Sequence, residues 1–322
     1  MSPIGRPGES AARLRVLLLP AIFFFCSLQV RAATFYLTIA GLGGEPDYDQ
    51  RFAMWADEIE TILKGYGDSK IETLKSPAST RANIRAALEK IARESKPDDA
   101  LVVMLIGHGS YDGYDYKMNL PGPDLTGTDL AALLDRVPTT RQLVVNMTSA
   151  SGGAMNALRK ENRVVITATK AGTERNATVF ARYFVEALRD PAADTDKNDT
   201  ISALEAFHYA QHKVAEYYET EKRLATEHAL LEDTGKNSGV RDPSVENREG
   251  LRAAAFPLVH LGAAKSLANN PEKKKLLAKK EQLEQQIDEL KYNKSMMAPD
   301  QYKKTLTGLL IELAKTQQEL DQ

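Results

Sequence analysis

Cysteine is almost missing from this sequence, because the chain of 322 residues has only one, Cys26. Cys26 lies in an N-terminal segment that we expect to be removed. The mature chain would then have no disulfide, no thiolate metal ligand and no thiol nucleophile. An excess of one charge is missing too, since 42 Lys and Arg residues stand against 44 Asp and Glu residues. A basic face for nucleic acid is therefore not indicated, and we expect no nucleic acid as a partner.

Apolar runs of bilayer-spanning length are also lacking. The apolar stretch Val16–Leu28 follows two arginines and precedes Val30–Ala32, which offers small or slim side chains at the −3 and −1 sites. This order is typical of a secretory signal peptide, and we predict that residues 1–32 are one, with cleavage after residue 32 or 33. The alternatives are an uncleaved membrane anchor, for which the run is short, and a lipoprotein lipidated at Cys26, which no small residue precedes. We expect a secreted or periplasmic protein.

Strand and helix patterns alternate between residues 34 and 218. The apolar runs Phe35–Ala40, Ala100–Ile106 and Gln142–Asn146 predict buried strands, each followed by a loop. Apolar residues at helical spacing predict helices such as Arg51–Tyr66 and Arg81–Ser95 between them. This alternation predicts an α/β domain with a mostly parallel sheet and helices on both faces. Ligands of such sheets bind beyond the carboxyl ends of the strands.

Two further segments follow the α/β domain. Residues 219–269 are polar and irregular, whereas 271–322 have the pattern of a helical hairpin. Apolar residues in its second half step by four and three, as in a coiled-coil core: Tyr302, Leu306, Leu309, Leu313, Thr316 and Leu320. We predict an antiparallel coiled coil that packs on itself or on another copy, and hence a route to self-association or partner binding.

Two polar residues come directly after predicted strands. His108 follows Ala100–Ile106 in the string GHGS, and Ser149 follows Gln142–Asn146 in MTSASGG. These strings, in this order and after these strands, resemble the legumain family of peptidases (family C13) and, more distantly, the caspases. The resemblance covers residues 34 to 184. It implies a caspase- and legumain-like fold and a hydrolase acting on peptides or proteins.

The resemblance also implies roles for single residues. His108 matches the general base, and Ser149 stands where the family has its nucleophilic cysteine. The backbone N–H groups of Gly109 and Ser149 match the donors that stabilise an oxyanion. Ungapped alignment places Asp47 at the family's histidine-orienting Asn, with Asp49 as a nearby alternative. A Ser-His-Asp arrangement would follow.

Substrate-binding positions carry over less completely. Met147 stands where the family has an acidic residue of its specificity pocket. Thr169 and Arg175 lie in the stretch 168–178, which resembles the substrate-lining strand and loop, and Arg175 is placed to meet an acidic or amide side chain. Serine needs more help than cysteine to act as a nucleophile. Two functions therefore stay open: an endopeptidase using Ser149 and His108, and an inactive pseudopeptidase that binds a peptide or protein.

A separate motif is independent of the family. Residues 194–205 have the spacing of a twelve-residue EF-hand loop, with oxygen ligands expected from Asp194, Asp196, Asn198, Thr200, Ser202 and Glu205. The usual glycine in its middle is replaced by Asp199, a residue type that tolerates positive φ. We predict a Ca²⁺ site, the alternative being an acidic loop that caps the next helix. His208 and His212 form no HExxH motif, so we expect no zinc.

Overall fold

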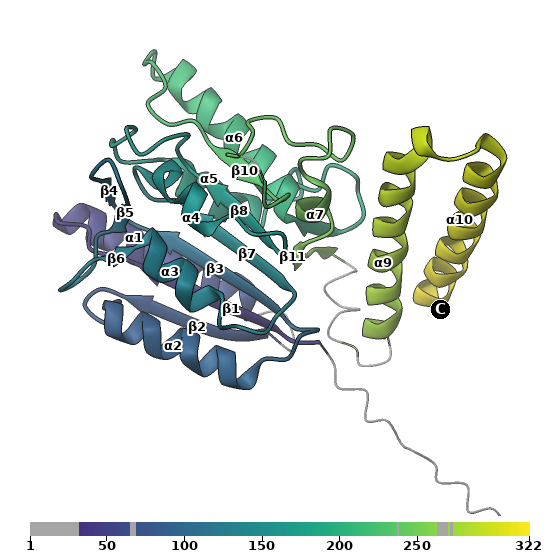
Figure 1. Ribbon diagram of the computed structural model, residues 1–322, viewed down its shortest axis with the longest axis horizontal. Coiled ribbons are helices and arrows are strands. Elements are labelled where there is room, and N and C mark those ends of the chain that lie inside the picture. Colours follow the sequence, from purple (N-terminus) through teal and green to yellow (C-terminus); the bar gives the residue numbers. More distant parts are fainter. Residues whose placement is uncertain (1–31, 65–68, 237, 263–269, 271–272) are drawn as a thin grey trace, which may run out of the picture. The chain divides into compact units, whose positions relative to one another are not determined.

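A six-stranded sheet organises the chain (Figure 1). Its strand order is β10-β8-β7-β3-β1-β2, and every pair is parallel except β10 with β8. The strands are β1 (Thr34–Ala40), β2 (Ser69–Lys75), β3 (Ala100–Ile106), β7 (Arg141–Asn146), β8 (Arg163–Thr167) and β10 (Leu230–Glu232). The predicted mostly parallel α/β sheet is thus confirmed.

The computed structural model describes residues 32–64, 69–236, 238–262, 270 and 273–322. The predicted signal peptide, except for its last residue, lies outside these ranges. Within them, no helix has both the length and the apolar character that crossing a bilayer requires.

Helices cover both faces of the sheet because its strands are apolar on both sides. On β3, Val102, Met104 and Ile106 belong to one buried cluster, and the alternate residues Leu101, Val103 and Leu105 belong to the other. The first cluster includes residues of α1 (Pro46–Leu63), α5 (Phe180–Ala187) and α6 (Ala203–Thr220). The second includes residues of α2 (Arg81–Glu94), α3 (Gly127–Leu134) and α4 (Met155–Leu158).

Short elements complete the domain, and most of them were not predicted. A three-stranded antiparallel sheet consists of β4 (Gly109–Tyr111), β5 (Tyr116–Met118) and β6 (Leu125–Thr126). A two-stranded one pairs β9 (Thr200–Ser202) with β11 (Pro257–His260). The 3₁₀ helix η1 (Ser151–Ala154) follows Ser149, and α7 (Leu251–Ala254) precedes β11.

Helix α1 begins five residues earlier than the predicted Arg51. Pro46 occupies its first turn, where the fixed φ of proline suits a helix and its missing N–H costs nothing. The earlier start places Asp47 and Asp49 in the first helical turn rather than in a loop. Both acids interact favourably with the positive end of the helix dipole there.

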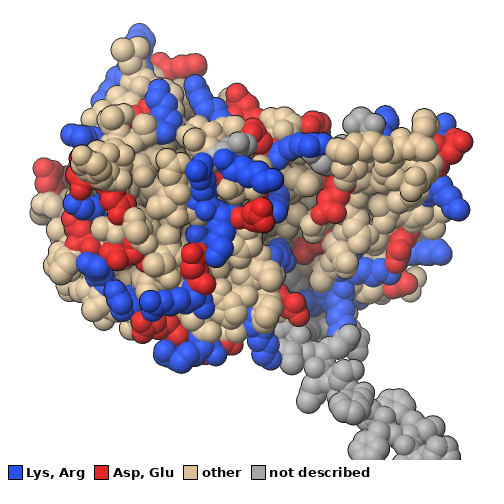
Figure 2. Space-filling view, viewed as in Figure 1, with Lys and Arg blue, Asp and Glu red and all other residues tan. Residues whose placement is uncertain are grey.

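The C-terminal segment forms the two predicted helices, α9 (Lys273–Tyr292) and α10 (Pro299–Asp321), with η2 (Asn293–Met296) between them. Leu283 and Leu320 are buried, and Lys279 pairs with Glu312 at 3.0 Å across the hairpin. Acidic and basic side chains are interspersed over the face of the molecule in Figure 2, so that face has no broad field of one sign.

Candidate functional site

His108 lies directly beyond the carboxyl end of β3, between β3 and β4. Its ring makes edge contacts with two aromatic rings of α1, at 4.6 Å from Tyr48 and 5.1 Å from Phe52 between centroids. Burial lowers the pKa of His108 below its ordinary value, although a hydrogen bond with the Gly43 backbone and the carboxylates of Glu45 and Asp49 act in the opposite direction. The imidazole is therefore mainly neutral at pH 7, the form that can accept a proton.

Ser149 lies beyond the neighbouring strand β7, so adjacent parallel strands bring the two sequence-predicted residues to one edge of the sheet. The Ser149 hydroxyl accepts a hydrogen bond of 3.2 Å from the Gly109 N–H. Among the hydrogen bonds of the described residues, none joins the Ser149 hydroxyl to His108. Ser149 is also only 2% exposed. The nucleophile position is thus enclosed and is bound to an amide rather than to the base.

The predicted orienting residue Asp47 requires a correction. Asp47 is exposed in the first turn of α1, and the carboxylates that influence His108 belong to Glu45 and Asp49. Asp49 Oδ1 accepts the Gly43 N–H at 2.6 Å, and the Gly43 backbone in turn bonds the imidazole. The alternative residue, Asp49, is therefore linked to His108 through Gly43. The early start of α1 at Pro46 places Asp47 in a helical turn, where its side chain is exposed.

A buried polar network that the sequence did not reveal supports Gly109 and Ser149. The Tyr116 hydroxyl lies 2.6 Å from Thr148 Oγ1, which also donates to Asn146 Oδ1 at 2.8 Å. All three side chains are fully or almost fully buried, and burial raises the pKa of the Tyr116 phenol, which stays protonated. A Cβ on Gly109 would lie 2.6 Å from the Tyr116 ring and 2.5 Å from the Ser149 carbonyl oxygen. Only glycine fits between these groups.

The three predicted substrate-binding residues do not line an open pocket together. Met147 is fully buried in the core cluster that contains α1, so its thioether does not face a ligand. Thr169 is fully buried as well, and its hydroxyl accepts the Gly152 N–H at 2.9 Å. Arg175 is exposed and donates to the Tyr111 carbonyl at 3.2 Å. Thr169 and Arg175 thus form hydrogen bonds to other segments of the chain. Residue spacing in the sequence does not predict such long-range contacts.

Two residues whose contact the sequence did not predict, Glu174 and His228, stabilise the segment that follows Ser149. The Glu174 carbonyl accepts the N–H of Ala150, which has a left-handed φ of 55°. The Glu174 carboxylate lies 2.5 Å from His228 Nδ1. His228 is far from Glu174 in the sequence, so no motif links them. Together they fix the turn that follows Ser149.

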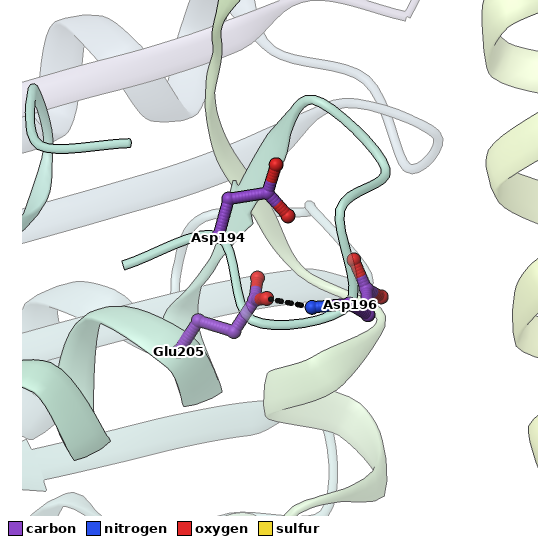
Figure 3. Close-up of side chains that lie close together, drawn as sticks. All are labelled: Asp194, Asp196 and Glu205. Atoms are coloured by element: carbon purple, nitrogen blue, oxygen red, sulfur yellow. Dashed lines mark hydrogen bonds between the residues drawn. The ribbon is translucent and has the colours of Figure 1, made fainter. Parts of the chain in front are cut away.

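The predicted EF-hand loop brings its three carboxylates together (Figure 3). Ligand atoms of Asp194, Asp196 and Glu205 all lie within 4.8 Å of one another. Asp194 accepts the N–H groups of Asn198 and Asp199 at 3.1 Å each, and Asp199 has the expected positive φ, 64°. Burial and the neighbouring Glu205 raise the pKa of Asp196 to about 6.

The other predicted ligands of the loop have protein partners. Asn198 donates to Asp196 Oδ2 at 3.1 Å, and the Thr200 hydroxyl lies 3.2 Å from His260 Nδ1. Ser202 caps α6 and forms a capping box with Glu205. The alternative prediction, a loop that caps the next helix, therefore describes a real part of this segment.

Comparisons with known proteins agree with this architecture. Residues 80–230, which include both His108 and Ser149, match the model of the Peptidase C13 family. The family match, together with the mostly parallel sheet, gives this domain a legumain- and caspase-like C13 peptidase fold. The resemblance inferred from the two short strings is thus confirmed at the level of the fold.

Solved structures with which the chain was compared are only remotely similar to it. A Geobacter sulfurreducens protein is 12% identical with a TM-score of 0.42, over 62% of this chain and 92% of that one. The Drosophila initiator caspase Dronc is 10% identical, with a TM-score of 0.41 over 65% and 82%. Caspase-1 from Spodoptera frugiperda is 13% identical, with a TM-score of 0.41 over 63% and 86%. A search of curated proteins gave no match.

Proposed function

We propose that the C13-type domain binds a peptide segment at the carboxyl edge of β3 and β7. An open cavity beside His108 carries this proposal. The cavity measures about 330 Å³, within the range of ligand pockets, and Tyr48 lines it while its ring also contacts His108. Thr178, another lining residue, donates to the Met147 carbonyl at 2.7 Å, two residues before Ser149. Lining residues of the cavity therefore contact His108 directly, through Tyr48, and the segment that precedes Ser149, through Thr178.

Peptide hydrolysis by Ser149 is the second candidate function. It is favoured by Gly109, whose N–H lies 3.2 Å from Ser149 Oγ and which the family resemblance matches to an oxyanion donor, and by the lowered pKa of His108. A serine hydroxyl also needs a base within hydrogen-bond reach, a contact that can tighten when a substrate binds. The enclosed hydroxyl and the missing Ser149–His108 bond among the described residues make binding the better-supported function.

Binding and hydrolysis can be separated with one pair of assays on the full chain. The immobilised protein is exposed to a mixed library of acetylated hexapeptides, and retained peptides are identified by mass spectrometry. Labelling by a fluorophosphonate probe is measured in parallel. We expect retention of peptides by wild type and by Ser149→Ala alike, and no probe labelling of either.

Labelling of wild type that Ser149→Ala abolishes would establish Ser149 as a reactive nucleophile and favour hydrolysis instead. Ser110→Ala is the matched control, because Ser110 is exposed two residues after His108 and should label like wild type. A library from which neither protein retains any peptide would contradict the binding function.

The loop 194–205 adds a separate proposal, a structural Ca²⁺ ion. Three carboxylates whose ligand atoms lie within 4.8 Å support it, since hard cations prefer such oxygens. The ion would relieve the repulsion among Asp194, Asp196 and Glu205. It would also join the start of the loop to α6, because Glu205 lies in the first turn of that helix.

Calcium should therefore stabilise the fold by mass action. At a free concentration one hundred times Kd the gain is about 2.7 kcal/mol, which calorimetry would detect as a rise of several degrees in Tm. Asp196→Asn should remove the effect without disturbing the capping box, which it does not join. Asp98→Asn, at an exposed acid elsewhere, should retain it. An unchanged melting curve of wild type in millimolar calcium would rule out the ion.

The C-terminal hairpin supports a further proposal, self-association through α10. Leu310 and Ile311 are 47% and 53% exposed on this helix, whereas Leu320 near its end is buried. Apolar residues left in water favour contact with another apolar surface. We expect light scattering to show a dimer that Leu310→Lys with Ile311→Lys dissociates, while Thr307→Lys, also at an exposed position of α10, does not. A wild-type monomer at every concentration would contradict self-association.

A further inference from the structure

The cavity beside His108 has an unusual charge balance. Arg51 from α1 and Arg223, which follows α6, both line it, and no Asp or Glu is among its lining residues. The remaining lining is mostly polar or aromatic, with Asn176, Thr178 and Thr226 as the polar residues and Ala177 and Val179 as the apolar ones. A concave site with two cationic side chains and few competing acids suits an anionic group.

Neither arginine has an ion-pair partner among the described residues. Other arginines of the chain do have partners: Arg81 pairs with Asp129, Arg163 with Asp135 and Arg189 with Glu58. Arg51 instead lies over the Tyr48 ring, with its guanidinium carbon 5.2 Å from the centroid. Guanidinium groups bind carboxylates through two parallel hydrogen bonds, so both side chains have donors to offer.

Glu227, a buried acid next in the sequence to the lining residue Thr226, is engaged elsewhere. Glu227 is only 3% exposed, and its two oxygens accept the N–H groups of Val179 and Phe180, at 2.8 and 3.2 Å. The Tyr218 hydroxyl donates to it as well, at 3.1 Å. Val179 and Tyr218 line the cavity, so Glu227 fixes the cavity wall from behind. Its oxygens are satisfied by the wall and do not occupy the cavity.

The cavity is also close enough to the candidate site to share one ligand. The order of contacts is Arg51, then Tyr48, then His108, with separations of 5.2 and 4.6 Å. On the other side, Thr178 bonds the Met147 carbonyl near Ser149. A peptide bound along the carboxyl edge of β3 and β7, next to His108 and Ser149, would place one of its own side chains or its C-terminus in the cavity.

We propose that this cavity binds a carboxylate of the peptide, between Arg51 and Arg223. The inference rests on the proposed peptide-binding function and names the chemistry that the site selects. An acidic side chain and a free C-terminus both supply a carboxylate. A site of this kind gives the peptide a fixed register relative to His108 and Ser149.

The test compares N-acetylated peptides that differ only in the carboxylate, with binding to the full wild-type chain measured by calorimetry. One pair is Ala-Ala-Asp-Ala-Ala-amide and its Asn analogue, and the other is penta-alanine with a free or an amidated C-terminus. We expect the carboxylate member of one pair to bind about tenfold more tightly or better, as a charge-assisted hydrogen bond allows. The pair that responds identifies the source of the carboxylate.

Arg51→Gln and Arg223→Gln should each reduce this preference at least several-fold while leaving the weaker amide peptide unaffected. Arg85→Gln is the control, because Arg85 is exposed on α2, which covers the other face of the sheet. Equal binding of carboxylate and amide peptides would overturn the cavity's role and leave peptide binding intact. A preference that survives both substitutions would overturn the role of these two arginines. Absence of binding by every peptide would overturn the proposed function as well.

Discussion

Gly109→Ala is expected to abolish peptide binding at the candidate site and to destabilise the fold by about 1–3 kcal/mol or more. The added Cβ would lie 2.5 Å from the Ser149 carbonyl oxygen, 2.6 Å from Tyr116 Cε2 and 2.9 Å from Thr148 Oγ1. Tyr116 and Thr148 are buried and bonded to each other, so neither can move away cheaply. The strain must therefore displace Ser149 or β4, which begins at Gly109.

Binding would be measured with the peptides retained by wild type, and stability by urea unfolding. Gly308→Ala is the matched control, since a Cβ on Gly308 in α10 would meet nothing within 4 Å. Alanine in an exposed helix should raise the free energy of unfolding by roughly 0.5–1 kcal/mol. A Gly109→Ala protein with wild-type stability and wild-type binding would show that the close contact between the two strand ends is unimportant.

The sequence was sufficient to predict the sheet because each buried strand leaves a local pattern. Ala100–Ile106 reads as an apolar run and forms β3 over the same residues. Neighbouring parallel strands then bring His108 and Ser149 to one edge, a consequence of topology rather than of side-chain detail. The EF-hand spacing likewise encodes short-range geometry, and its three carboxylates do come together.

Features that depend on contacts distant in sequence could not be predicted in this way. Glu174 and His228 meet across 54 positions, and Glu227 reaches back to the start of α5 across 48. Arg51 and Arg223 line one cavity although they belong to different segments. No local spacing marks such pairs, because each residue alone reads as a solvated surface charge.

The error at Asp47 had a local cause. The alignment without gaps assumed that the loop continues up to Arg51. In the structure, α1 already begins at Pro46, within that assumed loop. In this helical turn Asp47 is exposed, whereas Asp49 accepts a hydrogen bond from the Gly43 N–H. Proline at the first helical position is a readable signal, and it would have favoured Asp49.

Arg163→Met is expected to cost about 2–5 kcal/mol of the free energy of unfolding, without a direct effect on the site. Arg163 is 1% exposed, and its guanidinium donates to Gln142 Oε1 at 2.9 Å, the Leu158 carbonyl at 2.7 Å and Asp135 Oδ1 at 2.8 Å. Methionine fills much of the volume but leaves the buried Gln142 and Leu158 acceptors without a donor.

Lys160→Met is the matched control, because Lys160 pairs with the same Asp135 oxygen at 2.9 Å but is 46% exposed. Such surface pairs contribute about 0–1 kcal/mol, so the control should remain close to wild type in urea unfolding. Equal losses in both variants would mean that burial adds nothing to the Arg163 interaction.

Acid unfolding provides an independent check on the same contact. Partial burial acts to raise the pKa of Asp135, but hydrogen bonds from Lys160 and Arg163 outweigh it and hold the pKa below its ordinary value. A lowered pKa stabilises the fold above the ordinary range of an aspartate, and this stabilisation is lost as the pH falls through the folded-state pKa. Arg163→Met should therefore lose less stability than wild type between neutral and acidic pH. Arg163 lies at the amino end of β8, opposite the carboxyl edge that holds Ser149 and His108, so peptide affinity below the variant's melting temperature should equal that of wild type.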